Sequence, residues 1–241
     1  MLRIAFAVSL LAATVGCSTI DSEDIETSGI NASMEVARTN DGSNVSVSLS
    51  AGALNFVSLN NGDVLKATAL GQTVELSENN LLNAISYFGR VDANAQGDEV
   101  TVSFERAEKT SAPSSTVVLP ASVEITAPAA SSVFSRANDP IVVEITGEAS
   151  TDALRLSWSG DCVDADGLDV PADQTSVTIN AGTIKKRAQV DENDPDSQPV
   201  PDSCTVSVRI ERRVLGTLDG AFKGGSISAV TSSSRDITSN L

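Results

Sequence analysis

Residues 34–49, MEVARTNDGSNVSVSL, contain two apolar and polar alternations separated by Asn40-Asp41-Gly42. A period of two places successive side chains on opposite faces of a β-strand, so one face of each strand is expected in a core. Asp-Gly between two such runs is typical of a hairpin turn. The apolar residues of the stretch occupy every second position: Met34, Val36, Val45, Val47 and Leu49. The stretch therefore predicts two antiparallel strands with one buried face.

The same pattern continues along the chain in both halves. Short turn signals separate the runs, at residues 60–63, 71, 79–80 and 96–98, and this spacing is expected of an antiparallel sandwich. Leu81–Val91 is the one stretch that fits a helix, although Tyr87 and Phe88 favour a strand. Alternating runs include Leu65 to Ala69, Val100 to Phe104, Ile141 to Ile145, Leu154 to Trp158 and Val206 to Ile210. The fold class predicted is all-β.

A change in composition divides the alternating runs into two domains. Residues 109–116, KTSAPSST, are small and polar and contain proline, which marks a linker. We therefore expect an N-terminal β-sandwich at residues 32–108 and a second one at residues 117–241. The second domain is expected to fold without the first, because its core and linker are separate. Its last residues, 231–241, are polar and are expected to fray.

The second half resembles an immunoglobulin-like sandwich in the order of its strands, with Trp158 on strand C and Cys204 at the head of strand F. That order implies that strands C and F are antiparallel neighbours, so the end of C lies beside the start of F. The chain departs from true immunoglobulin domains because its cysteines are not on strands B and F and no tyrosine corner is present. Trp158 is interpreted as a core residue rather than a ligand platform.

Residues 1–17, MLRIAFAVSLLAATVGC, combine Arg3 with an apolar run that closes on Gly16-Cys17. As a helix, this apolar run of about 12 residues would extend less than ~20 Å, which is too short to span the ~30 Å hydrocarbon core of a membrane. The segment resembles the signal and lipobox of bacterial lipoproteins, which implies cleavage of residues 1–16 and acylation of Cys17. Thr14 and Val15 depart from the usual residues of that motif. The alternative is an ordinary secretory signal with an incidental cysteine.

Charge and the residues after Cys17 indicate where such a chain resides. Cleavage removes Arg3 and leaves 15 basic against 32 acidic residues, so the chain is repelled by nucleic acid and by anionic membrane surfaces. The membrane is then reached through lipid on Cys17. In the lipoproteins that this signal resembles, Asp after the cysteine favours the inner membrane; Ser18 and Thr19 here favour the outer membrane. Residues 17–31 are acidic and are interpreted as a solvated tether.

Three cysteines in an oxidising compartment leave one unpaired unless Cys17 carries lipid. Cys162 and Cys204 are then expected to form a disulfide, which would stabilise the fold by about 4 kcal/mol in the chain-entropy model. A pair of buried free thiols is the alternative.

The residue types present restrict the chemistry. The chain contains no histidine, which excludes Ser-His-Asp and Cys-His catalysis and the usual zinc sites. Neither a G-x-S-x-G nor a Ser-x-x-Lys motif is present. The prediction is a non-catalytic structural or binding module with no small-molecule substrate and with a protein partner of unknown identity. An exported hydrolase that uses paired carboxylates remains an alternative.

One acidic cluster suggests a cation. Residues 161–169, DCVDADGLD, resemble part of a calcium loop, with Gly167 supplying a turn. A second acidic stretch lies at residues 191–196, and the disulfide would bring both to one tip of the domain. Calcium-dependent adhesion is therefore a further alternative, against a solvated Asp and Gly turn that binds nothing. The candidate ligands are Asp161, Asp164, Asp166 and Asp169.

Overall fold

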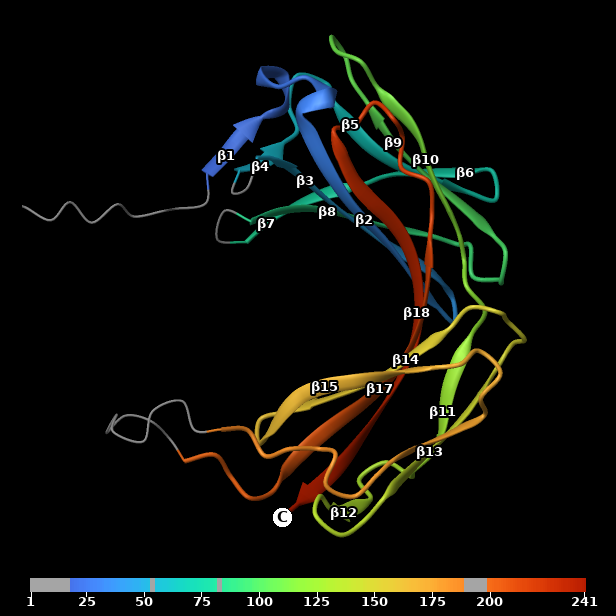
Figure 1. Ribbon diagram of the computed structural model, residues 1–241. Coiled ribbons are helices and arrows are strands. Elements are labelled where there is room, and N and C mark those ends of the chain that lie inside the picture. The colour runs from blue at the N-terminus through green and yellow to red at the C-terminus, as the bar shows by residue number, and fades with distance from the viewer. Residues whose placement is uncertain (1–17, 53–54, 82–83, 189–198) are drawn as a thin grey trace, which may run out of the picture.

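The structure is a computed structural model that describes residues 18–52, 55–81, 84–188 and 199–241. The signal segment, residues 1–16, and Cys17 lie outside this part of the chain. Strands are the dominant secondary structure of the described residues and form three sheets, and the helices there are two short 3-10 turns, so the all-β sandwich fold is confirmed. The molecule has the shape of the letter C, with two lobes connected by the long strand β18 (Figure 1).

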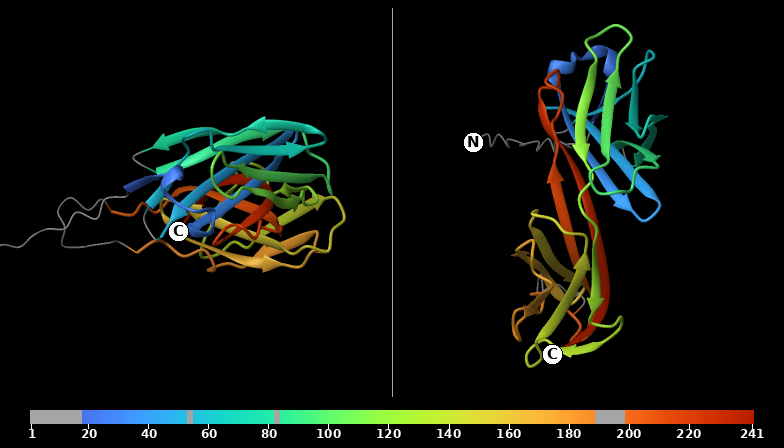
Figure 2. Two further views of the ribbon diagram at one scale, coloured as in Figure 1. Left: turned by 90° about the horizontal axis from the view of Figure 1, so that it is seen from above. Right: turned by 90° about the vertical axis from the view of Figure 1, so that its right-hand side faces the viewer.

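The largest sheet runs through both lobes and lines the inside of the C (Figures 1 and 2). Two smaller sheets cover its outer side, one in each lobe. The main path of the large sheet is β1 (Ser18–Asp21), β4 (Asn55–Ser58), β3 (Gly42–Ala51), β2 (Ile30–Thr39), β18 (Gly224–Asn240), β17 (Cys204–Leu215), β14 (Leu154–Gly160) and β15 (Val163–Val170). Three further strands pair with it off this path: β7 (Ser77–Leu81), β8 (Ala84–Val91) and β12 (Val133–Ser135).

Each smaller sheet closes one lobe. In the first lobe its strands are β10 (Ala112–Val118), β9 (Glu99–Glu105), β5 (Val64–Ala69) and β6 (Gln72–Glu75). In the second lobe they are β11 (Val123–Ala127), β13 (Ile141–Gly147) and β16 (Ser176–Ile179). Two short 3-10 helices, η1 (Ser22–Asp24) and η2 (Thr27–Gly29), precede β2.

The β2–β3 hairpin confirms the prediction from residues 34–49. Met34 pairs with Val47 and Val36 pairs with Val45, and all four side chains are buried in the first core. Gly42 occupies the turn end of β3 with φ +146°, and a Cβ there would lie 2.7 Å from the Val91 carbonyl oxygen, so only glycine fits. Within Leu81–Val91, β8 is a strand, as its aromatic residues predict.

Strand β18 belongs to both lobes, which corrects the domain boundaries. Its first part pairs in parallel with β2, and most of its length pairs with β17. Ile227 lies in the first core and Ile237 in the second. A strand of 17 residues extends ~55 Å, which is long enough to cross both lobes. Residues 216–230 therefore lie in the first lobe, although the sequence placed them in the second domain.

The residues expected to be a tether are instead packed on the first lobe. Ile20 and Ile25 contact its core, and β1 pairs in parallel with β4. The physical reason is Arg106, whose fully buried guanidinium binds the Asp63 carboxylate at 2.9 Å. The same guanidinium donates to the backbone carbonyls of Ser22 and Ile25. Residues 18–31 satisfy the remaining hydrogen-bond donors of a buried cation, so they are ordered.

Two further expectations are corrected by strand pairing. Part of the proposed linker, from Ala112 onward, is strand β10, which pairs with β9 in the first sheet. The C-terminal residues do not fray but extend β18 to Asn240, paired with β17 and β12. The second lobe is also not formed by one continuous, separate segment of the chain, because β18 pairs in the first lobe before it enters the second. Independent folding of residues 117–241 is therefore not expected from this topology.

We predict that Arg106→Met lowers the free energy of unfolding by about 3–5 kcal/mol, because it leaves the Asp63 carboxylate buried without its cation. The matched control is Lys66→Met, whose ion pair with Glu105 is largely exposed and is worth about 0–1 kcal/mol. Urea unfolding of both variants measures the difference. Equal losses in the two variants would contradict the role assigned to Arg106.

Candidate functional site

The inner side of the C is a continuous polar sheet face, which we call the concave face. It consists of the outward positions of β3, β2, β18, β17 and β14, which alternate with core residues. Many carry hydroxyl or amide groups: Asn44, Ser46, Ser48, Ser50, Ser157, Ser159, Thr205, Ser207, Ser232 and Ser234. A face of this kind offers many hydrogen-bond donors and acceptors. Two large apolar side chains are also exposed on it: Leu215 at an outward position of β17, and Phe88 of β8, which pairs with Ser46.

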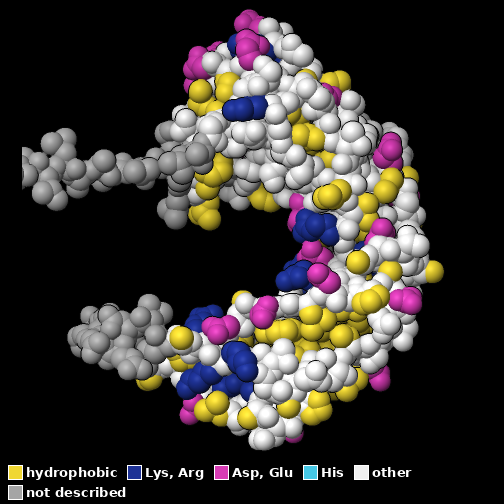
Figure 3. All heavy atoms as spheres, viewed as in Figure 1, with side chains coloured by type: hydrophobic (Ala, Val, Ile, Leu, Met, Phe, Trp, Pro, Cys, Tyr) yellow, Lys and Arg dark blue, Asp and Glu magenta, His cyan; other side chains and the backbone are white. Residues whose placement is uncertain are grey.

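Charged side chains gather at the deepest part of the concave face (Figure 3). Arg213 pairs with Glu35 at 2.9 Å and with Glu211 at 3.0 Å, and it donates to the Ser228 hydroxyl at 2.8 Å. Arg209 also pairs with Glu211, at 3.0 Å. We call these four charged residues the waist ladder. It connects β17 to β2 across β18, and its two positive and two negative charges balance.

The electrostatics of the waist ladder favour the charged form of Arg213. Burial alone would lower the pKa of Arg213, but hydrogen bonds from its guanidinium to Glu35 and Glu211 outweigh that effect and raise the pKa. Because the side chains are partly exposed, each pair contributes only about 0–1 kcal/mol to stability. The ladder therefore sets the charge pattern of the concave face more than it stabilises the fold.

A second polar network fixes the two lobes to each other at their junction. Arg38 of β2 pairs with Glu148, which follows β13, at 2.8 Å. Arg38 also donates to the carbonyls of Asn94 at 2.7 Å and Pro120 at 2.6 Å. The Arg38 guanidinium and then the Ser122 N–H stabilise the ionised carboxylate and lower the pKa of Glu148 to about 2. The angle between the lobes is thus held by groups from both sides.

Two adjoining cavities lie at this junction, with volumes of about 470 and 600 Å³. They share Asn40, Ser122, Val123 and Ser232, and most of their other lining residues are polar. Among the described residues, Asp63 is the sole buried carboxylate, and it is paired with Arg106. The part of the chain that is described therefore provides no close pair of buried carboxylates, the arrangement that the hydrolase alternative requires.

The four aspartates proposed as calcium ligands are not gathered around one point. Gly167 does not form a turn but lies inside β15, paired with Ser157, where a Cβ would be 2.5 Å from the Leu156 carbonyl oxygen. An extended strand separates its residues by ~3.3 Å each, so the carboxylates of Asp164 and Asp169 are spread along it. Asp169 is paired with Arg155 at 2.9 Å. No cluster of three or more potential metal ligands occurs in residues 18–52, 55–81, 84–188 and 199–241.

The other two aspartates and the second acidic stretch do not supply a calcium site either. Asp161 and Asp166 are exposed, and Asp166 accepts a hydrogen bond from the N–H of Gly167 at 2.8 Å. Residues 191–196 lie outside the described residues. The physical reason is that Gly167 allows the close approach of β14 to β15 and does not form a turn.

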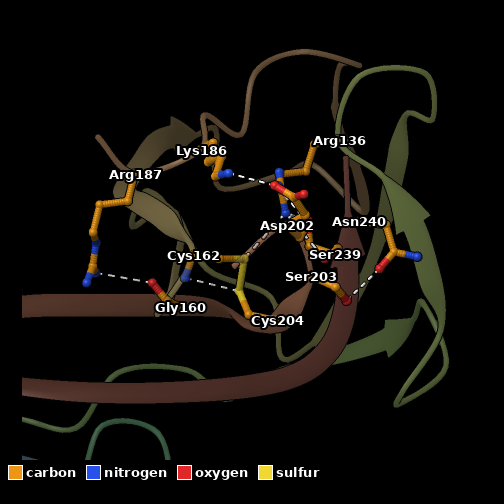
Figure 4. The surroundings of a disulfide bond; sticks show 10 residues. All are labelled: Arg136, Gly160, Cys162, Lys186, Arg187, Asp202, Ser203, Cys204, Ser239 and Asn240. Atoms are coloured by element: carbon orange, nitrogen blue, oxygen red, sulfur yellow. Dashed lines mark hydrogen bonds and ion pairs between the residues drawn. A yellow bond between two sulfur atoms is a disulfide. The ribbon is translucent and has the colours of Figure 1, made fainter. Parts of the chain in front are cut away.

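The predicted disulfide between Cys162 and Cys204 is present, with Cα atoms 5.8 Å apart (Figure 4). It joins the turn between β14 and β15 to the start of β17. Strands β14 and β17 are antiparallel neighbours, as expected of strands C and F. Trp158 of β14 lies opposite Val208 of β17 and is buried in the second core, as interpreted from the sequence. Around the bridge, Lys186 pairs with Asp202 and Arg187 donates to the Gly160 carbonyl.

Sequence reasoning missed the waist ladder, because charges at alternate positions of a strand look like an ordinary solvated face. The pairing of Glu35 with Arg213 depends on register between distant segments. One signal for the junction, though not for the ladder itself, was available in the sequence: Arg212 stands at a core position of the alternation through Val208 and Ile210. A charge at such a position indicates that the strand passes the end of its core, as β17 does at the junction.

The fold is similar to several solved structures, all at low identity. The Yersinia pseudotuberculosis adhesin InvE matches with a TM-score of 0.25 and 12% identity over 88% of this chain and 59% of that one. A two-domain fibronectin type-III segment of chicken tenascin matches with a TM-score of 0.23 and 14% identity, over 83% of this chain and 98% of that one. The Bacteroides ovatus mixed-linkage glucan utilization locus SGBP-B, in complex with a mixed-linkage heptasaccharide, matches with a TM-score of 0.22 and 8% identity. The match covers 96% of this chain and 70% of that one.

These similarities concern the class of fold alone, and at such TM-scores they carry no argument about function. This chain spans less than two thirds of the adhesin's length. No protein-family model matches the sequence, and no curated protein matches it. In the described part of the chain, no helix is both long and apolar enough to cross a membrane.

We predict that Glu148→Gln destabilises the protein at pH 7 and that its difference from wild type disappears in acid. A lowered pKa in the folded state gives stability that is present above the unfolded value near 4.5 and is lost as the pH falls through about 2. Urea unfolding at pH 7, 4 and 1.5 measures this, because the last pH lies below the pKa of the folded state. A difference that is independent of pH would contradict the ionised pair with Arg38.

Proposed function

We propose that the protein is a lipid-anchored, non-catalytic binding module of the bacterial outer membrane. The concave face carries the proposal: one sheet continues through both lobes and presents a polar surface with balanced charges. Its partner is a hydrophilic protein that contacts both lobes. The junction network of Arg38 and Glu148 keeps the two halves of this surface in a fixed relation, which lowers the ordering cost of binding.

Lipid anchoring rests on residues 1–17 and gains a consequence from the fold. The first described residue, Ser18, is already part of β1, which pairs with β4. An acylated Cys17 would therefore be attached directly to the first lobe, without the tether that the sequence indicated. The module would lie at the membrane surface and could not search the ~20 Å that a flexible linker of this length allows.

For the anchor, we predict that the mature N-terminus is an acylated Cys17 and that Cys17→Ser abolishes membrane association. Acyl chains contribute ~0.8 kcal/mol per buried methylene, so their loss removes stable attachment. Mass spectrometry of the N-terminal peptide and fractionation with and without detergent are the measurements. An unmodified Cys17, or cleavage at another position, would exclude the lipoprotein hypothesis and leave the concave face untouched.

For the binding surface, we predict that the concave face is covered in the native envelope. A photo-crosslinking residue placed at Asn44 or Ser234 should give one discrete adduct in intact cells. Thr178, exposed on β16 in the outer sheet, is the matched control and should give none. Adducts from Thr178 alone, or equal adducts from all three positions, would contradict binding through this face.

A further inference from the structure

The Cys162–Cys204 bridge lies beside a buried cation that is not neutralised by a carboxylate. Arg136 has 6% of its surface exposed, and its Nη1 donates to Cys162 Sγ at 3.4 Å (Figure 4). The guanidinium otherwise donates to uncharged acceptors: the Asp202 carbonyl at 2.9 Å, the Ser239 hydroxyl at 3.1 Å and the Ser239 carbonyl at 3.3 Å. In the described part of the chain, no carboxylate forms an ion pair with it.

The other charged side chains of the neighbouring segments lie at the surface. Lys186 pairs with Asp202 at 2.6 Å, so the nearest carboxylate on β17's side of the bridge already has a partner. Exposed charges are screened by water and salt, so Arg136 acts on the buried sulfur more strongly than they do. The described charged residues of these segments are Asp161, Asp164, Lys185, Lys186, Arg187 and Asp202, and all are exposed.

Reduction of the bridge would supply the missing counter-charge. A guanidinium stays protonated at neutral pH, so the buried positive charge is present whether the bridge is closed or open. Apolar surroundings alone disfavour a thiolate, whereas a neighbouring arginine favours it. Because the cation is already buried, a Cys162 thiolate would neutralise a charge in the core and would not add an isolated one. Arg136 therefore stabilises the reduced form relative to the disulfide.

We propose that the bridge is a reversible site of thiol–disulfide exchange, reduced by an external dithiol. Cys162 is fully buried and Cys204 is partly exposed, so the thiolate of the dithiol attacks Cys204. A new S–S bond forms there, the bond to Cys162 breaks, and its electron pair remains on Cys162 as a thiolate beside Arg136. The second thiol of the reductant then displaces Cys204, which takes up a proton, and the dithiol leaves as a disulfide.

Reduction would loosen one end of the second lobe and leave its sheet paired. The bridge ties the turn between β14 and β15 to the start of β17, whereas the main-chain pairing of these strands extends from Leu154 to Gly160. The Arg187 N–H donates to the Cys162 carbonyl at 3.0 Å, so the segment at Arg187 is held by the same turn. This site is separate from the concave face, and it does not depend on lipid anchoring.

The first test compares the two sulfurs in the mature full-length chain with Cys17→Ser, which removes the third cysteine. Adding Cys204→Ser leaves Cys162 as the sole thiol, and adding Cys162→Ser leaves Cys204, so both variants lack the bridge equally. Ultraviolet absorbance of the thiolate is measured against pH. The Cys162 thiolate should form roughly one pH unit or more below the ordinary cysteine value of about 8.5, and below that of Cys204. Equal titration of the two thiols, or titration of Cys162 at the ordinary value or above, would overturn the proposal.

The second test measures the bridge itself, by equilibrating the Cys17→Ser chain with mixtures of reduced and oxidised dithiothreitol. Arg136→Met removes the cation, and it should raise at least tenfold the ratio of reduced to oxidised dithiothreitol at which half of the bridges are open. Partial unfolding of this variant would act in the opposite direction, because an unfolded chain holds its cysteines together less well. A bridge that opens as easily in Arg136→Met as in the parent chain, or more easily, would contradict the role of the arginine.

The matched control is Arg212→Met. Arg212 is also buried, with 3% of its surface exposed, and donates to backbone carbonyls at the other end of the second lobe. Its loss should not raise the ratio of reduced to oxidised dithiothreitol that opens half of the bridges. A tenfold rise in both variants would show that the loss of any buried arginine has this effect, and it would overturn the assignment of Arg136.

Discussion

The architecture depends on one strand that is shared by two hydrophobic cores. Over residues 228–230, β18 is paired with β17 on one side and with β2 on the other. Beyond that point it leaves the first lobe, and its inward side chains change from apolar to polar until Ile237 enters the second core. Ser233 and Arg235 there bind the backbone of Ile125 on β11. Strand β18 is thus paired on both sides of the junction, and the lobes cannot separate without breaking its hydrogen bonds.

Arginines occupy the ends of both cores, where a sandwich leaves backbone groups uncovered. Arg106 holds the outer end of the first lobe and Arg38 its junction end, each with a carboxylate partner. Arg212 and Arg136 hold the two ends of the second lobe, and both donate to backbone carbonyls. A guanidinium suits this position because its several donors reach different segments at once.

The sequence predicted what is local and missed what depends on register. Alternation identified the strands around Met34 and Val47, and cysteine parity identified the Cys162–Cys204 bridge. The segment after Cys17 looked like a tether, because its packing against the first lobe depends on the distant Arg106. Gly167 looked like a turn, because close approach to the Leu156 carbonyl is not visible in composition. The crossing of β18 and the pairing of Glu35 with Arg213 likewise require contacts between segments far apart in the chain.

The chain contains a single tryptophan and a single tyrosine, and they report on different lobes. Trp158 is buried in the second core, and Tyr87 is buried in the first. One urea titration can follow Trp158 by fluorescence and Tyr87 by second-derivative absorbance. If β18 makes the lobes one cooperative unit, both probes will give the same midpoint and the same slope. Two separate midpoints would show that each lobe unfolds alone, and they would contradict the shared strand as the constraint on which the fold depends.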